Sequence, residues 1–208
     1  MNKLITLSLT LLLSSATSSF GQLKTTASFE SKKFYYNNLV KTSDENVIAL
    51  DVRYGFKKTK YNLTKFDADM HNTVSREVEI EQSKNDQTML SYFSFSDNFY
   101  VFKAHETQSK LTGTIQVIDQ NTLLESGEEK LLFEVDHKDE FVVSKITLSV
   151  SPDGKYLVLN VPNLGAFFID NTLTNILKST AGGDIEGLTI HTEHVTNNGD
   201  YYQVYTKA

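Results

Sequence analysis

The 208-residue sequence contains no cysteine and no tryptophan, and it has only two prolines. Without cysteine, disulfides cannot stabilise the chain, and no lipid can be attached at an N-terminal cysteine as in a bacterial lipoprotein. No P-loop, dinucleotide fingerprint, nucleophile elbow or zinc signature occurs. The apolar run Leu4–Leu13 is too short to span a bilayer, and no other run comes closer, so we expect no membrane insertion.

The first 21 residues have the pattern of a secretory signal peptide. Lys3 supplies the positive start, Leu4–Leu13 the apolar segment, and Ser19 and Gly21 the small residues before a cleavage site at Gln22. The pattern predicts a signal peptide over 1–21, an N-terminal extension over 22–32, and export to the periplasm or the medium.

The formal net charge of −6 comes from acidic and basic residues that are evenly mixed along the chain. Nucleic acid and anionic membranes require clustered positive charge, so neither is expected as a partner. The one basic cluster, Lys57-Lys58-Thr59-Lys60, lies between two strand-like segments. A solvated hairpin tip is the plainer interpretation of this cluster, and a binding patch is the alternative.

Four turn signals recur at a nearly fixed period. They begin at Ser43, Ser96, Ser151 and Thr196, at intervals of 53, 55 and 45 residues. An apolar or aromatic strand-like segment follows each of them at once, over 46–54, 98–104, 155–160 and 200–205. A period of this size is typical of a repeat architecture, in which one supersecondary unit is copied along the chain.

A second landmark occurs once in each period. Phe66-Asp67, Ile118-Asp119 and Ile169-Asp170 close apolar strands at spacings of 52 and 51 residues. The unit therefore consists of strand a, a Ser-x-Asp turn, strand b, a longer loop, strand c ending in Asp, a turn and strand d. Four antiparallel strands in about 50 residues make up one β-propeller blade.

The predicted fold is all-β and β-propeller-like, over residues 33–208. It has about three four-stranded blades, at 33–82, 87–136 and 143–180, and a partial fourth at 185–208. We interpret the Ser and Asp residues of the turns as structural. Such side chains accept hydrogen bonds from backbone amides two residues on, while Gly or Asn takes a positive φ, and together they fix hairpin register.

The segment Ser151-Pro152-Asp153-Gly154-Lys155-Tyr156-Leu157 resembles the turn-and-strand motif of TolB-like and WD-repeat-like propeller blades. The wider pattern, from Phe95 through Ile115–Asp119 and Glu128–Phe133 to Ser151, is similar to secreted propeller-repeat proteins of Bacteroidota. The resemblance covers about Lys33 to Tyr205 and implies the fold. It also implies that the b–c and d–a loops form the rim where propellers usually bind ligands.

The fourth unit is short, and three explanations stay open. The chain is the front portion of a longer propeller, or it closes as a four-bladed ring with Thr25–Phe29 as an added outer strand. Alternatively, two copies pair edge to edge as a homodimer, because the segment Tyr201–Tyr205 would otherwise leave an apolar edge.

Few residues have the pattern of a chemical site. His191 and His194 are three apart on a predicted strand and would point to opposite faces, so they do not suit one metal ion. Asp67, Asp69 and His71 lack the Gly and distal Glu of a calcium loop, and a turn is the plainer interpretation. The segment Asp136–Glu140 reads as a charged d–a loop.

The aromatic residues Tyr35, Tyr36, Tyr92 and Phe93 fit packing between blades. No catalytic, cofactor-binding or metal-binding residue is assigned, and no cofactor is expected. The favoured function is a non-catalytic exported binding or scaffold module that presents propeller loops to a protein or glycan partner. The alternatives are a propeller-type enzyme (a glycan hydrolase or lyase, or a peptidase-associated propeller) and a fragment without activity of its own. The Ser-x-Asp turns lack the Gly-x-Thr-Trp of sialidase-type Asp boxes.

Overall fold

The computed structural model describes residues 38–42, 46–55, 57–136, 143–162, 164–173, 176–179 and 188–207, which belong to one compact unit, Phe34–Ala208. Some of the predicted features lie outside these ranges. They are the signal peptide, the extension over 22–32, the strand at Thr25–Phe29, the packing of Tyr35 and Tyr36, and the turn residues Ser43, Asp44 and Glu45. In the described part of the chain, no helix has the length and apolar character that a membrane crossing requires.

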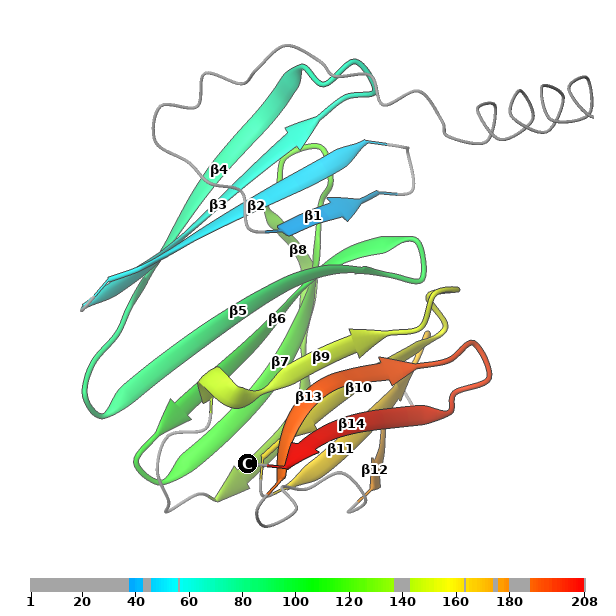
Figure 1. The fold of residues 1–208 in the computed structure, drawn as a ribbon. Helices are drawn as coiled ribbons and strands as arrows, with labels where there is room; N and C mark the ends of the chain where they lie inside the picture. The colour runs from blue at the N-terminus through cyan, green and yellow to red at the C-terminus, as the bar shows by residue number, and fades with distance from the viewer. Residues whose placement is uncertain are drawn as a thin grey trace, which may run out of the picture. The chain divides into compact units, whose positions relative to one another are not determined.

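The described residues form four antiparallel sheets, which confirms the all-β prediction (Figure 1). Sheet 1 contains β1 (Asn38–Lys41), β2 (Val47–Tyr54), β3 (Lys58–Phe66) and β4 (Asn72–Glu81). Sheet 2 contains β5 (Asp86–Phe95), β6 (Asn98–Thr107), β7 (Lys110–Ile118) and β8 (Glu125–Asp136). Sheet 3 contains β9 (Thr147–Val150), β10 (Tyr156–Val161), β11 (Gly165–Asp170) and β12 (Ile176–Ser179). Sheet 4 contains β13 (Leu188–Val195) and β14 (Tyr201–Lys207), and a 3-10 turn, η1 (Val143–Lys145), precedes β9.

Every sheet is a simple meander, in which each strand pairs with the strand before it. The outer strand β4 alternates strictly between exposed and half-buried residues, as a strand with one solvated face should. In contrast, β6 contains the continuous buried run Phe99–Phe102. A strand that is apolar on both faces requires a packed layer on each side, so sheet 2 lies between two neighbours.

Three apolar clusters hold adjacent sheets face to face. Between sheets 1 and 2, Tyr92 packs against Tyr61 and Phe99 with ring centroids 6.2 and 6.1 Å away. Between sheets 2 and 3, the rings of Phe133 and Phe167 stack at 4.9 Å. The packing role that the sequence predicts for Tyr92 and Phe93 is confirmed, since both are buried in these clusters.

The a–b turns connect neighbouring sheets as well as closing their own hairpins. Ser94 Oγ donates to the Lys41 carbonyl (2.9 Å), and the Ser96 amide donates to the Gly154 carbonyl (3.1 Å). The Asp153 amide donates to Asn197 Oδ1 (3.0 Å), which extends the series to sheet 4. The β5–β6, β9–β10 and β13–β14 turns accordingly lie along one side of the four sheets, at the right in Figure 1.

The a–b turns do not all have the same backbone. In β9–β10 and β13–β14 the positive φ falls on Gly154 and Gly199, as the sequence predicts. In the two-residue β5–β6 turn, Ser96 and Asp97 themselves have φ values of 47° and 63°. Positive φ at both central positions is the pattern of a type I′ turn, and neither residue is Gly, so this turn carries some strain.

The Asp that ends each strand c caps the following c–d turn, which confirms the structural interpretation of these residues. Asp119 Oδ1 accepts the amides of Asn121 (2.9 Å) and Thr122 (2.8 Å). Asp67 and Asp170 accept amides in the same way, Asp67 from Asp69 and His71 and Asp170 from Thr172. The turn interpretation of 67–71 is therefore confirmed.

A second inter-sheet contact recurs at the c–d turns, and the sequence pattern did not reveal it. Arg76 on β4 donates to the carbonyl of Leu123 (2.6 Å), and Lys130 on β8 donates to the carbonyl of Leu173. Both leucines have a positive φ, 57° and 56°, so the two turns share an unusual backbone conformation at the residue that is bonded. A cation on strand d thus holds the next sheet at its c–d turn.

Replacing Gly113 with Ala should destabilise the protein by about 1–3 kcal/mol, because a β-carbon there overpacks the core. That β-carbon would lie 2.3 Å from Phe133 Cε1, and Phe133 is held against Phe167. Urea unfolding measures the effect. Gly113→Ala should cost less in a Phe133→Leu background than in the original protein, whereas an equal cost in both backgrounds would contradict the clash.

Replacing Asp119 with Asn should lower the melting temperature at pH 7 more than at pH 3. The amide of Thr122, and then that of Asn121, hold the pKa of the Asp119 carboxyl below its ordinary value of 3.8. A lowered folded-state pKa gives stability that is present above pH 3.8 and is lost as the pH falls through the folded value. Thermal unfolding at both pH values tests this, with Asp97→Asn as the control. A melting difference that is equal at pH 7 and pH 3 would rule out a role for the charged cap.

Candidate functional site

A cleft of about 400 Å³ lies between sheets 1 and 2, at the end opposite the a–b turns. The β2–β3 hairpin, the β4–β5 connection, the start of β5 and η1 surround it (the left side of Figure 1). These segments are b–c and d–a connections in the predicted unit. The lining residues are Tyr54, Gly55, Thr59, Tyr61, Gln82, Ser83, Gln87, Thr88, Met89, Val143 and Ser144.

One wall of the cleft comes from a single face of sheet 1. Tyr54 pairs with Thr59 and Val52 pairs with Tyr61 across β2 and β3, so all four side chains share the face toward sheet 2. The tight connection between these strands needs Gly55, because a β-carbon there would lie 2.7 Å from the Lys58 carbonyl oxygen. The hairpin geometry therefore brings Tyr54 to the rim of the cleft.

Tyr61 joins this wall to the opposite sheet. Its side chain is buried, and its hydroxyl oxygen accepts the Leu90 amide of β5 at 3.0 Å. Burial raises the pKa of the Tyr61 hydroxyl above its ordinary value of 10.0, so the group stays protonated. That oxygen acts as an acceptor toward Leu90, and this bond fixes the ring of Tyr61 against β5.

The opposite wall is the first part of β5, where the Gln82 side chain forms two bonds to the backbone of Thr88. Gln82 Nε2 donates to the Thr88 carbonyl (2.6 Å), and Gln82 Oε1 accepts the Thr88 amide (2.9 Å). A neighbouring strand would form the same two bonds. The Gln82 amide therefore occupies the outer edge of β5, which is the first strand of sheet 2.

His105 supports the same wall from β6. Its Nδ1 lies 2.9 Å from Thr88 Oγ1 and 3.4 Å from Asp86 Oδ1. A catalytic triad needs the hydroxyl and the carboxylate on different ring nitrogens. Here both lie at Nδ1, so the group braces Thr88 and does not form a relay.

The η1 turn forms the third side, and a buried carboxylate holds it there. Glu106 is completely buried, and its Oε2 accepts the Val143 amide at 2.7 Å. A charge-assisted bond of this kind is stronger than a neutral one, particularly away from water. Glu106 is thus a positioning residue for Val143 and Ser144, which both line the cleft.

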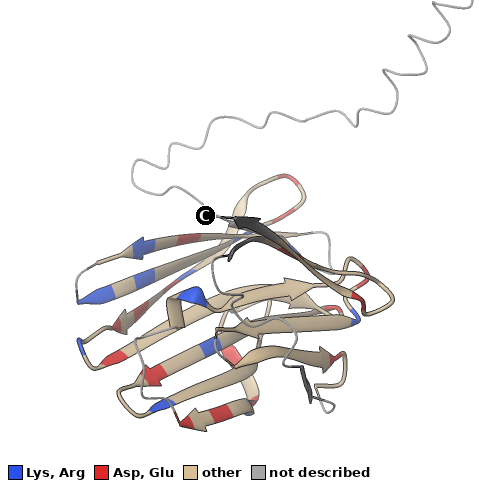
Figure 2. Ribbon diagram, turned by 60° about the horizontal axis from the view of Figure 1, so that its bottom comes forward, with Lys and Arg blue, Asp and Glu red and all other residues tan. Residues whose placement is uncertain are grey.

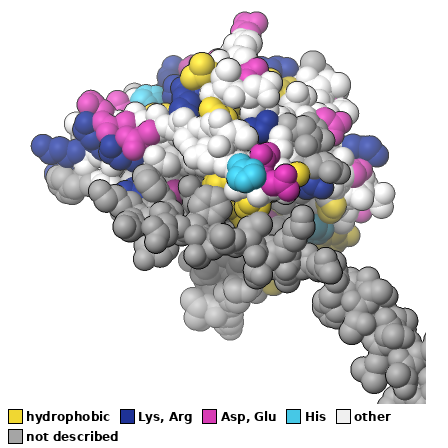
Figure 3. Space-filling view, turned by 90° about the horizontal axis from the view of Figure 1, so that it is seen from above, with side chains coloured by type: hydrophobic (Ala, Val, Ile, Leu, Met, Phe, Trp, Pro, Cys, Tyr) yellow, Lys and Arg dark blue, Asp and Glu magenta, His cyan; other side chains and the backbone are white. Residues whose placement is uncertain are grey.

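Among the residues that the structure describes, the side chains that line the cleft are uncharged, and they combine aromatic and aliphatic groups with amides and hydroxyls. Charged residues occur on the strands of the sheets with both signs present (Figure 2). In the face shown in Figure 3, Lys and Arg lie among Asp and Glu over the atoms that are coloured. The described lining thus offers apolar surface together with neutral hydrogen-bonding groups.

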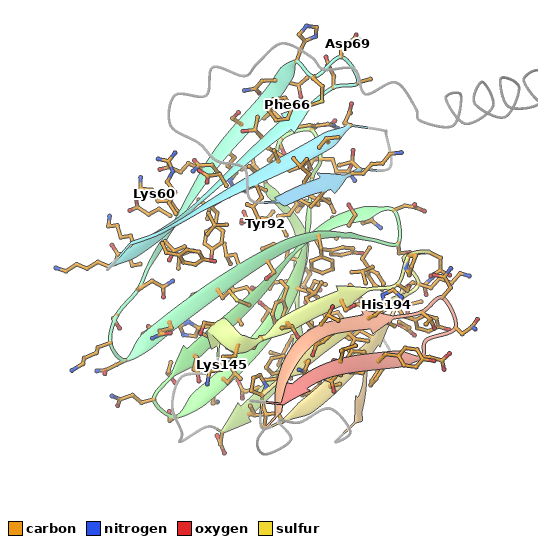
Figure 4. All side chains as sticks on the ribbon, in the orientation of Figure 1. Lys60, Phe66, Asp69, Tyr92, Lys145 and His194 are labelled. Carbon is orange, nitrogen blue, oxygen red and sulfur yellow. The ribbon has the colours of Figure 1, made fainter. Side chains whose placement is uncertain are left out.

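The basic cluster at 57–60 forms ion pairs across sheet 1. Lys60 Nζ lies 2.8 Å from Glu77 and 3.2 Å from Glu79, and Lys58 pairs with Glu79 as well. The hydrogen bond to Glu79 raises the pKa of Lys58 above 10.5, and those to Glu77 and then Glu79 raise the pKa of Lys60. The alternating Lys residues on β3 thus meet alternating Glu residues on β4, and Lys60 extends away from the sheets in Figure 4.

The other residues that the sequence singled out do not converge. In Figure 4, Asp69 lies at the tip of the β3–β4 turn and His194 lies far from it on β13. Next to His194, Glu193 accepts bonds from Asn160 (2.8 Å) and Gln203 (2.9 Å), between sheets 3 and 4. Among the residues that the structure describes, no group of three or more His, Asp or Glu side chains could hold a metal ion.

Of the segment Asp136–Glu140, only Asp136, the last residue of β8, is described, and the side chain of His191 also lies outside the description. The cleft residues were not singled out by their sequence pattern. Gln82, Tyr54 and Glu106 come from separate segments, and no local spacing connects them.

The chain matches no protein-family model, and no curated protein matches it. The geometry of the cleft is therefore the basis for assigning a function.

Replacing Gln82 with Ala should destabilise the protein by about 1–3 kcal/mol, because the backbone groups of Thr88 lose both partners. Replacing Gln87, a cleft residue on the same wall, with Ala should change stability by less than about 0.5 kcal/mol. Chemical unfolding of the two variants provides the comparison. Equal effects would mean that the Gln82 amide does not protect the β5 edge.

Proposed function

We propose that this protein is an exported, non-catalytic binding or scaffold module of the β-propeller type, which offers its loop cleft to a protein or glycan partner. The cleft between sheets 1 and 2 is the observation that carries the proposal. Its volume of about 400 Å³ falls within the usual range of ligand pockets, roughly 300–1,000 Å³. Its mixture of apolar side chains with a few polar groups is also typical of such pockets.

A propeller-like arrangement is supported by how the sheets follow one another. Sheets 1, 2 and 3 are four-stranded meanders in chain order, and each packs its face on the next through an apolar cluster. The repeated contacts at the a–b and c–d turns join neighbours in the same way. The resemblance of Ser151–Leu157 to TolB-like and WD-repeat-like blades agrees with this arrangement.

Binding is favoured over catalysis because the acid and histidine side chains around the cleft are engaged in structural contacts. Of the lining residues in the described part of the chain, none is a carboxylate, and the Glu106 carboxylate behind the cleft accepts the Val143 amide. His105 contacts Thr88 and Asp86 through one ring nitrogen, which is unsuited to proton relay. Export is part of the proposal because of the leader-like pattern of residues 1–21.

A bulky side chain at Ser144 should block the cleft. The full chain, expressed with its own leader and purified from the exported fraction, is screened against immobilised peptides and oligosaccharides. For a ligand found in this way, Ser144→Trp should weaken the affinity at least about tenfold, which is roughly 1.4 kcal/mol. Lys145→Trp changes the neighbouring exposed residue of η1, outside the cleft lining, and should leave the affinity unchanged (Figure 4).

Three results would contradict the proposal. A ligand that binds Ser144→Trp as well as the original protein would bind elsewhere. Retention of the whole chain inside the cell with an intact leader would contradict export. Reproducible turnover of a screened oligosaccharide or peptide would support a propeller-type enzyme instead.

A further inference from the structure

We propose that the ligand of the cleft between sheets 1 and 2 is a neutral carbohydrate chain, one face of which stacks on the ring of Tyr54. This inference rests on the proposed function, since it names the ligand class of the same cleft. Three features of the described residues lead to it: the absence of charge in the lining, the occupied backbone edge of β5, and an exposed aromatic ring at the rim.

The uncharged lining selects against charged ligands. A carboxylate or phosphate group that enters the cleft would lose hydration without gaining a cationic partner from the lining side chains. An ammonium group would likewise lose hydration without an anionic partner, because the described lining residues include no carboxylate. Uronic acids, phosphorylated ligands and charged peptide segments are therefore disfavoured against a neutral, hydroxyl-rich molecule.

An extended peptide would most readily bind by adding a strand to a sheet edge. The edge strand that lines the cleft is β5, and at Thr88 both its amide and its carbonyl are bonded to the Gln82 side chain. At Thr88, and at the Leu90 amide that donates to Tyr61, the main-chain groups that strand addition would use are thus already bonded within the protein. Recognition in this cleft depends on side chains, and a ligand without a strand-like backbone meets that condition.

Tyr54 supplies a flat apolar surface at the rim. Its side chain is 80 % exposed, although it belongs to the face of sheet 1 that is buried further along at Tyr61. The C–H groups on one face of a pyranose ring carry a slight positive charge, and the face of an aromatic ring is negative, so the two attract each other. A sugar ring stacked there would also cover the exposed apolar area.

The hydroxyl groups of the sugar would meet accessible polar groups in the cleft. The half-buried Gln87 amide and the exposed Ser83 and Ser144 hydroxyls line it and offer both donors and acceptors. Gln87 lies on the paired strand β5, so its backbone loses little freedom when a ligand binds.

Binding of neutral oligosaccharides to Tyr54 variants tests the inference. The full chain is titrated with neutral gluco-, manno- and xylo-oligosaccharides, with oligogalacturonate as a charged counterpart, and with a library of extended peptides, by calorimetry and by quenching of tyrosine fluorescence. At least one neutral oligosaccharide should bind. Tyr54→Ala should weaken that binding at least about tenfold, whereas Tyr54→Phe, which keeps the ring, should stay within about threefold.

Tyr202 provides the matched control, because it is also an exposed tyrosine, 57 % accessible, but it lies on β14 of sheet 4. Tyr202→Ala should leave the affinity unchanged. Binding of a peptide, and of no sugar, with the same dependence on Tyr54 would overturn the carbohydrate assignment and leave the proposed binding function intact. Sugar binding that is equal in Tyr54→Ala and Tyr202→Ala would overturn the stacking site. If neither sugars nor peptides bind in a way that Ser144→Trp blocks, both proposals fail.

Discussion

The burial of both faces of sheet 2 is the constraint on which the rest of the structure depends. Tyr92 and Phe99 face sheet 1, and Phe93 and Phe102 belong to the cluster shared with sheet 3. A sheet that is apolar on both sides is unstable unless it is covered twice. The stacking of sheets 1, 2 and 3 follows from this requirement, and the cleft lies between sheets 1 and 2 at the end where the exposed ring of Tyr54 is found.

The turns at the two ends of the sheets have different structural roles. At the a–b end, backbone and side-chain bonds connect each turn with the next, so these turns are committed to holding the sheets together. At the opposite end, the connections differ from unit to unit, and the Gln82 and Glu106 side chains stabilise them individually. The a–b turns are therefore constrained by their bonds to neighbouring sheets. The residues of the connections at the opposite end can vary more freely, and they line the cleft.

The sequence predicted those features that local chemistry determines. The capping bonds of Asp67, Asp119 and Asp170 lie within four residues of each Asp, and the all-β class follows from short alternating segments. The Arg76–Leu123 and Lys130–Leu173 contacts link residues more than 40 positions apart, so no local pattern contains them. The cleft was missed for the same reason. The ion pairs of sheet 1, in contrast, could have been predicted from the alternating Lys residues on β3 and Glu residues on β4. The positive φ of Ser96 and Asp97 was missed because Gly usually occupies such positions.

The carbonyls of Leu123 and Leu173 each receive a cation from the preceding sheet, and each such bond joins nearest neighbours. A molecule whose layers are linked in this manner behaves as a short one-dimensional array, in which the loss of one layer weakens only the layers beside it. Opening then proceeds inward from the ends of the series, and the interior layers, sheets 2 and 3, open last. The amide hydrogens of these two sheets would accordingly exchange more slowly with solvent than those of the two-stranded sheet 4.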